Sequence, residues 1–248
     1  MTGKKQILLA GFAALCMVLP ACRSKTAFVE NVESPLLVDS DMPLNTVSYT
    51  ADYTQDGALP FSCEVSLGTD GRIRRDYAWK DENGAEKKVS VVIDGAKAVR
   101  LEDGKTSPVR DIDTAKARFY AGLVLSPDSV ISNADRTKET GTFTAPDGVP
   151  CNGFAYVLKL VGVPDMESCL VATDPETNRW SVLFARMADG SGTVFSTRFL
   201  DYKTESGVTF PSQVVSTTDE GAPVRCVIRD VKINPELPDE LFRLPANS

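Results

Sequence analysis

The sequence predicts a mainly β fold, an antiparallel meander of about ten to twelve strands interrupted by one helix. Three observations support this. Short runs alternate apolar and polar residues, as in TVSYTADYT (46–54), which places Val47, Tyr49, Ala51 and Tyr53 on one face. Turn sequences such as GTDG (68–71) and EDGK (102–105) separate the runs. The connections are too short for parallel crossovers, so neighbouring strands should pair in antiparallel fashion.

The first residues have the features of an export signal. MTGKKQILLAGFAALCMVLPAC contains Lys4 and Lys5, then an apolar run from Ile7 to Leu19 that is short for a membrane span. The stretch LPAC (19–22) resembles a bacterial lipobox, with Cys22 as the residue that receives lipid. We expect 1–21 to be a signal peptide and Cys22 to be lipidated. The alternative is an ordinary signal peptide cut after Ala21.

The segment that follows is polar and contains two prolines, so 22–45 is predicted to be the lipidated N-terminus and a tether, part of which packs on the domain. Residues 46–248 then form the domain. Arg23 is not the aspartate that retains enterobacterial lipoproteins in the inner membrane. The expected location is therefore the bacterial cell envelope, at the outer membrane and facing the periplasm.

Composition excludes several classes of function. Of 248 residues, 25% are charged, the formal net charge is −7 and histidine is absent. An acidic chain is a poor nucleic-acid binder. Without histidine there is no Ser–His or Cys–His pair and no imidazole metal ligand. Paired carboxylates such as Asp111 and Asp113, or Asp174 and Glu176, fall at helix ends and turns, where solvated caps are the usual explanation. No enzymatic activity, catalytic residue, metal or cofactor is predicted.

Besides Cys22, four cysteines follow the signal segment: Cys63, Cys151, Cys169 and Cys226. An exported protein could oxidise them, and four cysteines allow three pairings. Cys63 falls in phase with the apolar residues of its strand, which is typical of a buried thiol. No disulfide is predicted.

One segment has the composition of a helix. DTAKARFYAGLVL (113–125) follows an aspartate cap, and Pro127 prevents its extension. Ala115, Phe119 and Leu123 would form its apolar stripe. Such a helix within a long meander would pack across the concave face of a curved sheet, or else plug one end of a closed barrel.

The later strands are apolar on both faces, which is unusual for an antiparallel sheet with one solvated side. Either the helix and tail cover the second face, or a hydrophobic ligand does. Plain core packing is the simpler explanation for each side chain. The candidate ligand-binding residues of a hydrophobic cavity are Phe119, Leu123, Phe154, Tyr156, Leu158, Trp180, Val182 and Phe184.

The last third of the chain resembles the LolA/LolB-like superfamily of outer-membrane lipoprotein-sorting and carrier proteins. The features that match are a DPET turn (174–177), DYKTESGVTFPSQV (201–214) and the ending VKINPELPDELFRLP (231–245), with VVIDGAKAVRL (91–101) upstream. The likeness covers roughly 46–245. Members of this family have an amphipathic helix before the first strand. No such helix is predicted here, because the segment 23–46 contains Pro35 and Pro43.

The resemblance implies an open, half-closed antiparallel β-barrel with one or two covering helices and an apolar hollow that holds acyl chains. The tail LPDELFRLP (237–245) would then dock on the barrel as a closing element. The implied partners are lipid or lipoprotein acyl chains, with a membrane reached through the N-terminal anchor and no nucleic acid. The implied role is lipoprotein sorting or lipid transport. The alternative is a structural or sensory envelope lipoprotein with a filled cavity that binds a protein partner.

Overall fold

The computed structural model describes residues 36–125, 138–144, 150–158, 166–187, 194–218 and 222–245, except positions 37, 41, 175 and 178. Cys22 and the predicted signal peptide lie outside the described residues. Within them, fourteen strands form a single antiparallel sheet. The elements are β1 (Asp39–Ser40), β2 (Thr46–Gln55), β3 (Phe61–Gly68), β4 (Ile73–Lys80), β5 (Glu86–Asp94), β6 (Lys97–Glu102), β7 (Lys105–Pro108), α1 (Asp111–Leu125), β8 (Lys138–Thr144), β9 (Pro150–Leu158), β10 (Met166–Thr173), β11 (Trp180–Met187), β12 (Val194–Glu205), β13 (Val208–Thr218), β14 (Val224–Ile233) and the 3₁₀ turn η3 (Asp239–Phe242).

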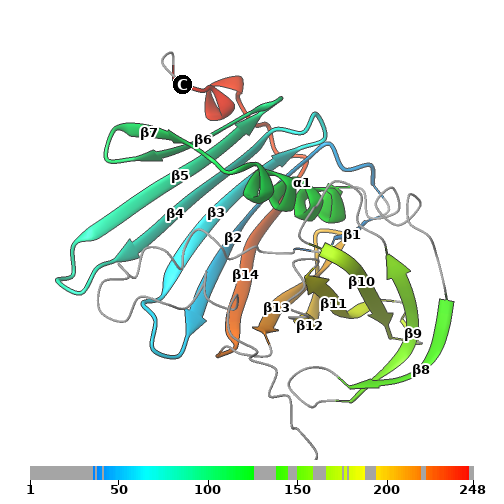
Figure 1. Ribbon diagram of the computed structural model, residues 1–248. Coiled ribbons are helices and arrows are strands. Elements are labelled where there is room, and N and C mark those ends of the chain that lie inside the picture. The colour runs from blue at the N-terminus through cyan, green and yellow to red at the C-terminus, as the bar shows by residue number, and fades with distance from the viewer. Residues whose placement is uncertain are drawn as a thin grey trace, which may run out of the picture.

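The strand order shows how the chain builds this sheet. It runs β7-β6-β5-β4-β3-β2-β14-β13-β12-β11-β10-β9-β8, with β1 added beside β13. The chain meanders outward from β2 to β7, follows α1 to the other half, and returns from β8 until β14 pairs with β2. The sheet curls around α1 without closing, since β7 and β8 end the path (Figure 1). This confirms the predicted open half-barrel with a covering helix.

The alternation in the sequence does set the core. In β2, Val47, Tyr49, Ala51 and Tyr53 are each at most 4% exposed, while the residues between them face outward. The same alternation continues through β3 and β4. One apolar cluster runs from these strands through α1 to β11–β14. We call this side of the sheet the concave face and the opposite side the outer face.

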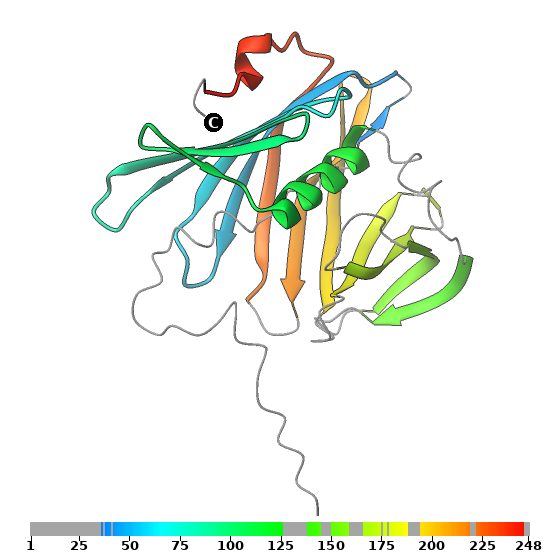
Figure 2. The same ribbon diagram turned by 45° about the horizontal axis from the view of Figure 1, so that its top comes forward.

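Helix α1 crosses the concave face above β2, β3 and β4 (Figures 1 and 2). Its buried side chains are Thr114, Ala117, Ala121, Leu123 and Val124. The predicted stripe was right for Leu123, which is buried, but Ala115 and Phe119 are only half-buried, and the smaller Ala117 and Ala121 are buried more deeply. Phe119 still packs against the core cluster.

The end of the predicted tether packs on the domain. Leu36 and Val38 are 0% and 6% exposed and belong to the core cluster. Strand β1 pairs with β13, where Asp39 lies opposite Thr209 and Ser40 opposite Val208. We call residues 36–40 the strap.

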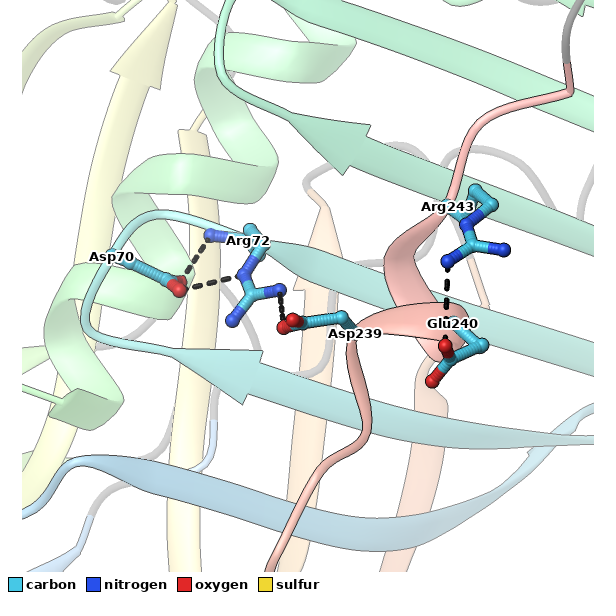
Figure 3. A network of polar contacts seen from close by, with 5 residues as sticks. All are labelled: Asp70, Arg72, Asp239, Glu240 and Arg243. Atoms are coloured by element: carbon cyan, nitrogen blue, oxygen red, sulfur yellow. Dashed lines mark hydrogen bonds and ion pairs between the residues drawn. The ribbon is translucent and has the colours of Figure 1, made fainter.

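The C-terminal tail docks on the outer face. Phe242 of η3 is 2% exposed, and the Arg72 guanidinium stacks over its ring at 4.8 Å. Arg72 also bridges two carboxylates, Asp70 at 2.6 Å and Asp239 at 2.7 Å (Figure 3). A guanidinium held between two acids and an aromatic ring has little freedom, so this clamp fixes the tail in one place.

The contact with Arg74 shows on which face of the sheet the tail docks. Arg74 alternates along β4 with the buried residues of the concave face, and its Nη1 donates to the Leu241 carbonyl at 2.8 Å. The tail and α1 therefore lie on opposite faces (Figure 2). The expectation that the tail closes the barrel opening is wrong. Instead it covers the back of β4 and β5.

Asn234 joins the two ends of the domain. Its backbone has a φ of 53°, a left-handed conformation that asparagine tolerates better than most residues. Its Oδ1 accepts from the Asn45 N–H at 2.7 Å, and its Nδ2 donates to the Pro43 carbonyl at 2.9 Å. Its own N–H donates to the Thr46 carbonyl at 2.8 Å. The entry to β2 and the exit from β14 are thus held together.

The substitution Phe242→Ala should lower the free energy of unfolding by about 3 kcal/mol, the lower end of the range for a buried phenylalanine, because the tail can also detach locally. Chemical denaturation followed by tryptophan fluorescence would measure it. The matched control is Glu240→Ala, on the same turn but in an exposed pair with Arg243. It should change stability by less than about 0.5 kcal/mol. Equal effects of the two substitutions would contradict the docking of Phe242.

Candidate functional site

The concave face is one apolar wall built from both ends of the sequence. The register carries it across the β14–β2 pair: Tyr53 lies opposite Cys226, Cys226 opposite Val214, and Val214 opposite Phe199. Aromatic rings reinforce one end of the wall, where Tyr53 stacks on Phe61 with centroids 4.5 Å apart. The wall is therefore continuous from β2 to β12.

This wall is covered in the structure. Tyr53, Phe61, Val65 and Phe199 are each at most 4% exposed. Side chains that lined an open hollow would retain accessible surface. Where it is described, the face is thus filled by the protein's own groups. A ligand would enter by displacing a covering element.

Helix α1 is the element that covers β2, β3 and β4. Ala117 and Ala121, at the centre of its buried stripe, each contribute a single methyl group, worth about 0.8 kcal/mol. Its larger anchors are the fully buried Leu123 and Val124, and Phe119, Tyr120 and Leu125 pack against the core beside them. Arg118 donates a hydrogen bond to the Gly95 carbonyl and so ties the helix to the β5–β6 turn. The contacts of α1 with the sheet are thus mainly apolar, with Arg118 as a polar tie.

The two predicted site residues of α1 differ in their surroundings. Leu123 is 0% exposed, within the core. Phe119 is half-buried against that core and meets Tyr120 edge-on, with ring centroids 5.3 Å apart. Both lie on the covered side of the sheet.

The predicted residues of β11 do not share one face. Trp180 packs against the core cluster, 6.4 Å from Phe199 between ring centroids. Val182 and Phe184 are buried, at 1% and 9% exposed, but lie outside that cluster and out of phase with Leu183, which belongs to it. Grouping them with Trp180 on one wall was therefore wrong. The cause is a register shift after Ala172 that inserts one extra residue into β11.

The predicted residues of β9 can be placed by register alone. Tyr156 pairs with Val171, which in turn pairs with Leu183, so its backbone is aligned with a concave-face position. Phe154 is aligned with Trp180 through Thr173. Leu158 lies two residues from Tyr156 and pairs with Cys169. The side chains of these β9 residues lie outside the described residues.

The sequence analysis missed a charge on this face. Arg75 lies between Ile73 and Tyr77 in the buried phase of β4 and is 6% exposed. Arg75 pairs with Val91 of β5, which pairs in turn with Arg100 of β6, so the two arginines lie in one row across the strands. The Nη1 atom of Arg100 lies 2.6 Å from Oε2 of Glu102. The alternation in RIRRDYAW (72–79) was the signal that could have found Arg75, because an arginine stands at an apolar phase position.

The cysteines of the described core are free thiols, Cys63 at 1% and Cys226 at 4% exposed. This confirms the buried thiol predicted at Cys63. Burial among apolar groups raises the pKa of the Cys226 thiol to about 12, and the negative charge of Asp52 adds to the effect. Burial likewise raises the pKa of the Tyr53 hydroxyl well above its usual value. The side chains of Cys151 and Cys169 lie outside the described residues.

Of the carboxylates considered for chemistry, Asp113 pairs with Arg110 at 2.6 Å and Asp174 caps its own turn. Asp174 Oδ1 accepts from the Thr177 N–H at 2.8 Å and the Glu176 N–H at 2.9 Å. These bonds, chiefly from Thr177, lower the pKa of Asp174. The DPET sequence is thus a turn. Among the described residues, no group of three Cys, Asp or Glu could hold a metal, and no helix is both long and apolar enough to cross a membrane.

Comparison with known structures identifies the fold as LolA-like. A LolA superfamily protein from Nitrosomonas europaea matches with a TM-score of 0.51 at 12% identity, over 82% of this chain and 92% of its own. A DUF1329 family protein from Desulfovibrio piger matches with a TM-score of 0.56 at 12% identity, over 82% and 91%.

An outer membrane lipoprotein-sorting protein domain from Vibrio parahaemolyticus matches with a TM-score of 0.55 at 7% identity, over 82% of this chain and 91% of its own. No family model matches the sequence, and no curated protein matches it. The likeness therefore lies in the fold, which confirms the resemblance drawn from the sequence.

The burial of Cys226 predicts slow thiol chemistry. A thiol with a pKa of about 12 holds roughly a thousandfold less thiolate at pH 8 than an ordinary cysteine. In a chain starting at residue 23 and carrying Cys151→Ser and Cys169→Ser, an aromatic disulfide reagent should react with neither remaining thiol on the minute timescale. Both should react in guanidinium. Glu205→Cys, at an exposed position, is the positive control. Rapid reaction of Cys226 in the native protein would show that the wall opens readily.

Proposed function

We propose that this protein is a lipid-anchored envelope protein that holds acyl chains of a lipid or lipoprotein between the concave face and α1, in lipoprotein sorting or lipid transport. The observation that supports this most directly is the continuous apolar wall covered by a single helix. The LolA-like fold of the neighbours agrees with it.

The physics requires no catalytic group. An acyl chain that leaves water gains about 0.8 kcal/mol for each buried methylene. Lifting α1 would expose Leu123 and Val124 as well as two alanine methyl groups, and a long acyl chain that covers the same wall would offset this cost. The protein would act as a carrier and not as an enzyme.

Lipidation of Cys22 would set the distance from the membrane. Residues 23–36 span at most about 50 Å when fully extended. Because Leu36 is buried, the strap would fix the point on the domain from which this tether leaves. Such a tether suits an acceptor at the periplasmic side of the outer membrane better than a diffusing shuttle.

The second candidate is a structural or sensory lipoprotein with a filled interior that binds a protein partner. The tight burial of Tyr53, Phe61 and Val65 favours it. The two functions differ in whether α1 can be displaced, and that can be measured.

The experiment uses residues 23–248, which keep every described residue. Native mass spectrometry after incubation with phospholipid or a triacylated lipopeptide should show one-to-one adducts. Arg118→Ala removes the bond to Gly95 and should raise the rate of uptake about two- to tenfold, the equivalent of one hydrogen bond. Lys232→Ala, which removes an exposed charge on β14, should leave the rate unchanged. A mass that stays free of adducts with every lipid would refute the carrier and favour the second candidate.

A further inference from the structure

The charges of strands β2–β6 are divided unequally between the two faces. On the concave face, Arg75 and Arg100 lie in one row across the strands. Lys87 and Lys105 lie nearer the edge of that face. The one carboxylate that these strands place there is Glu102. The other carboxylates of the same strands are on the outer face, by register and alternation: Asp52, Glu64, Asp76, Glu86 and Asp94. In a chain with a net charge of −7, these strands thus place more cations than carboxylates on the concave face, with Arg100 paired to Glu102 and Lys87 to Asp81.

Arg75 is the deepest of these cations. At 6% exposed it is the one charged side chain among the described residues that is buried, and its row runs from Tyr49 through Val65 to Val91 and Arg100. A guanidinium stays charged at any ordinary pH, and placing it in an apolar wall is costly unless polar groups surround it. Arg75 already interacts with another group of the chain, which an arriving anion would replace or join.

Arg100 extends the charge toward solvent. Its side chain is 21% exposed and pairs with Glu102, which is 36% exposed. Arg75 and Arg100 stand two strands apart, about 10 Å between backbones, so their long side chains can converge on one headgroup. Arg75 and Arg100 thus bring two guanidinium groups to one row of an apolar wall, and Glu102 is the carboxylate that pairs with Arg100.

We propose that the concave face binds amphiphiles with an anionic headgroup, with the acid group held by Arg75 and Arg100 and the acyl chain on the apolar wall beneath α1. This rests on the proposed function and adds the ligand class. Guanidinium groups suit both phosphate and carboxylate, since each can accept two parallel hydrogen bonds. The shared chemistry is an anion joined to an acyl chain.

The test compares ligands that differ only in the headgroup. Dodecyl phosphate, dodecanoate and dodecanol compete with a neutral fluorescent probe, N-phenyl-1-naphthylamine, for residues 23–248. The two anions should compete at least tenfold better than dodecanol, as one charge-assisted bond allows. Arg75→Gln should abolish that preference while leaving dodecanol unchanged. Arg74→Gln is the matched control, because Arg74 lies next in sequence but binds Asp76 and the tail on the outer face.

Because Arg75 is buried, Arg75→Gln could fail to fold, so a second substitution at a partly exposed position tests the same proposal. Arg100→Gln lies at a partly exposed position and should reduce the preference for anions, with partial recovery in Arg100→Lys. Inorganic phosphate alone should compete weakly, and competition as strong as that of dodecyl phosphate would show a free-anion site and overturn the proposal. Equal binding of all three amphiphiles by every variant would overturn it while leaving the carrier function intact. Failure of all three to bind the unsubstituted chain would overturn both.

Discussion

The pairing of the last strand with the first is the constraint on which the rest of the structure depends. β14 adds to β2 and so joins two meanders that are separated by the whole sequence. Because Cys226 lies opposite Tyr53, the buried phase of one half continues into the other and the concave face becomes one wall. A slip of one residue would turn each strand's apolar set to the opposite face. Asn234 secures the register by binding the backbone on both sides of the junction.

The two faces of the sheet are finished in different ways. On the outer face, Phe242 is fixed by Arg72 and its two carboxylates, and Arg74 adds a bond to the tail backbone. On the concave face, α1 buries Leu123 and Val124 together with the small Ala117 and Ala121. The two covers thus differ in chemistry, because charged groups surround the docked ring of the tail while apolar packing seats the helix.

Much of the fold could be predicted because a period of two residues is a local property. The phase of β2 and the buried Cys63 follow directly from it. The position of the tail could not be predicted in this way, since Phe242 could dock on either face until Arg74 showed which one. The full stripe of α1 could not be predicted either, because hydrophobicity favoured Phe119 while the structure buries the smaller Ala117 and Ala121 more deeply. Val182 and Phe184 were assigned to the wrong face because a bulge in β11 shifts their phase relative to Trp180. A bulge depends on how two strands pair, which the sequence of one strand does not show.

Arg74 and Arg75 show that one step along a strand decides which face of the sheet a side chain lies on. They are neighbours of identical chemistry, yet Arg74 is bound by Asp76 at 2.7 Å on the outer face and Arg75 is buried on the inner one. Surface arginines cost little, while a buried arginine must be compensated by polar groups that fold with it. An apolar residue at position 75 would pack the wall more simply. Arg75 interacts with another group of the chain, so part of that compensation is internal, and its row with Arg100 is what leads us to propose an anionic ligand.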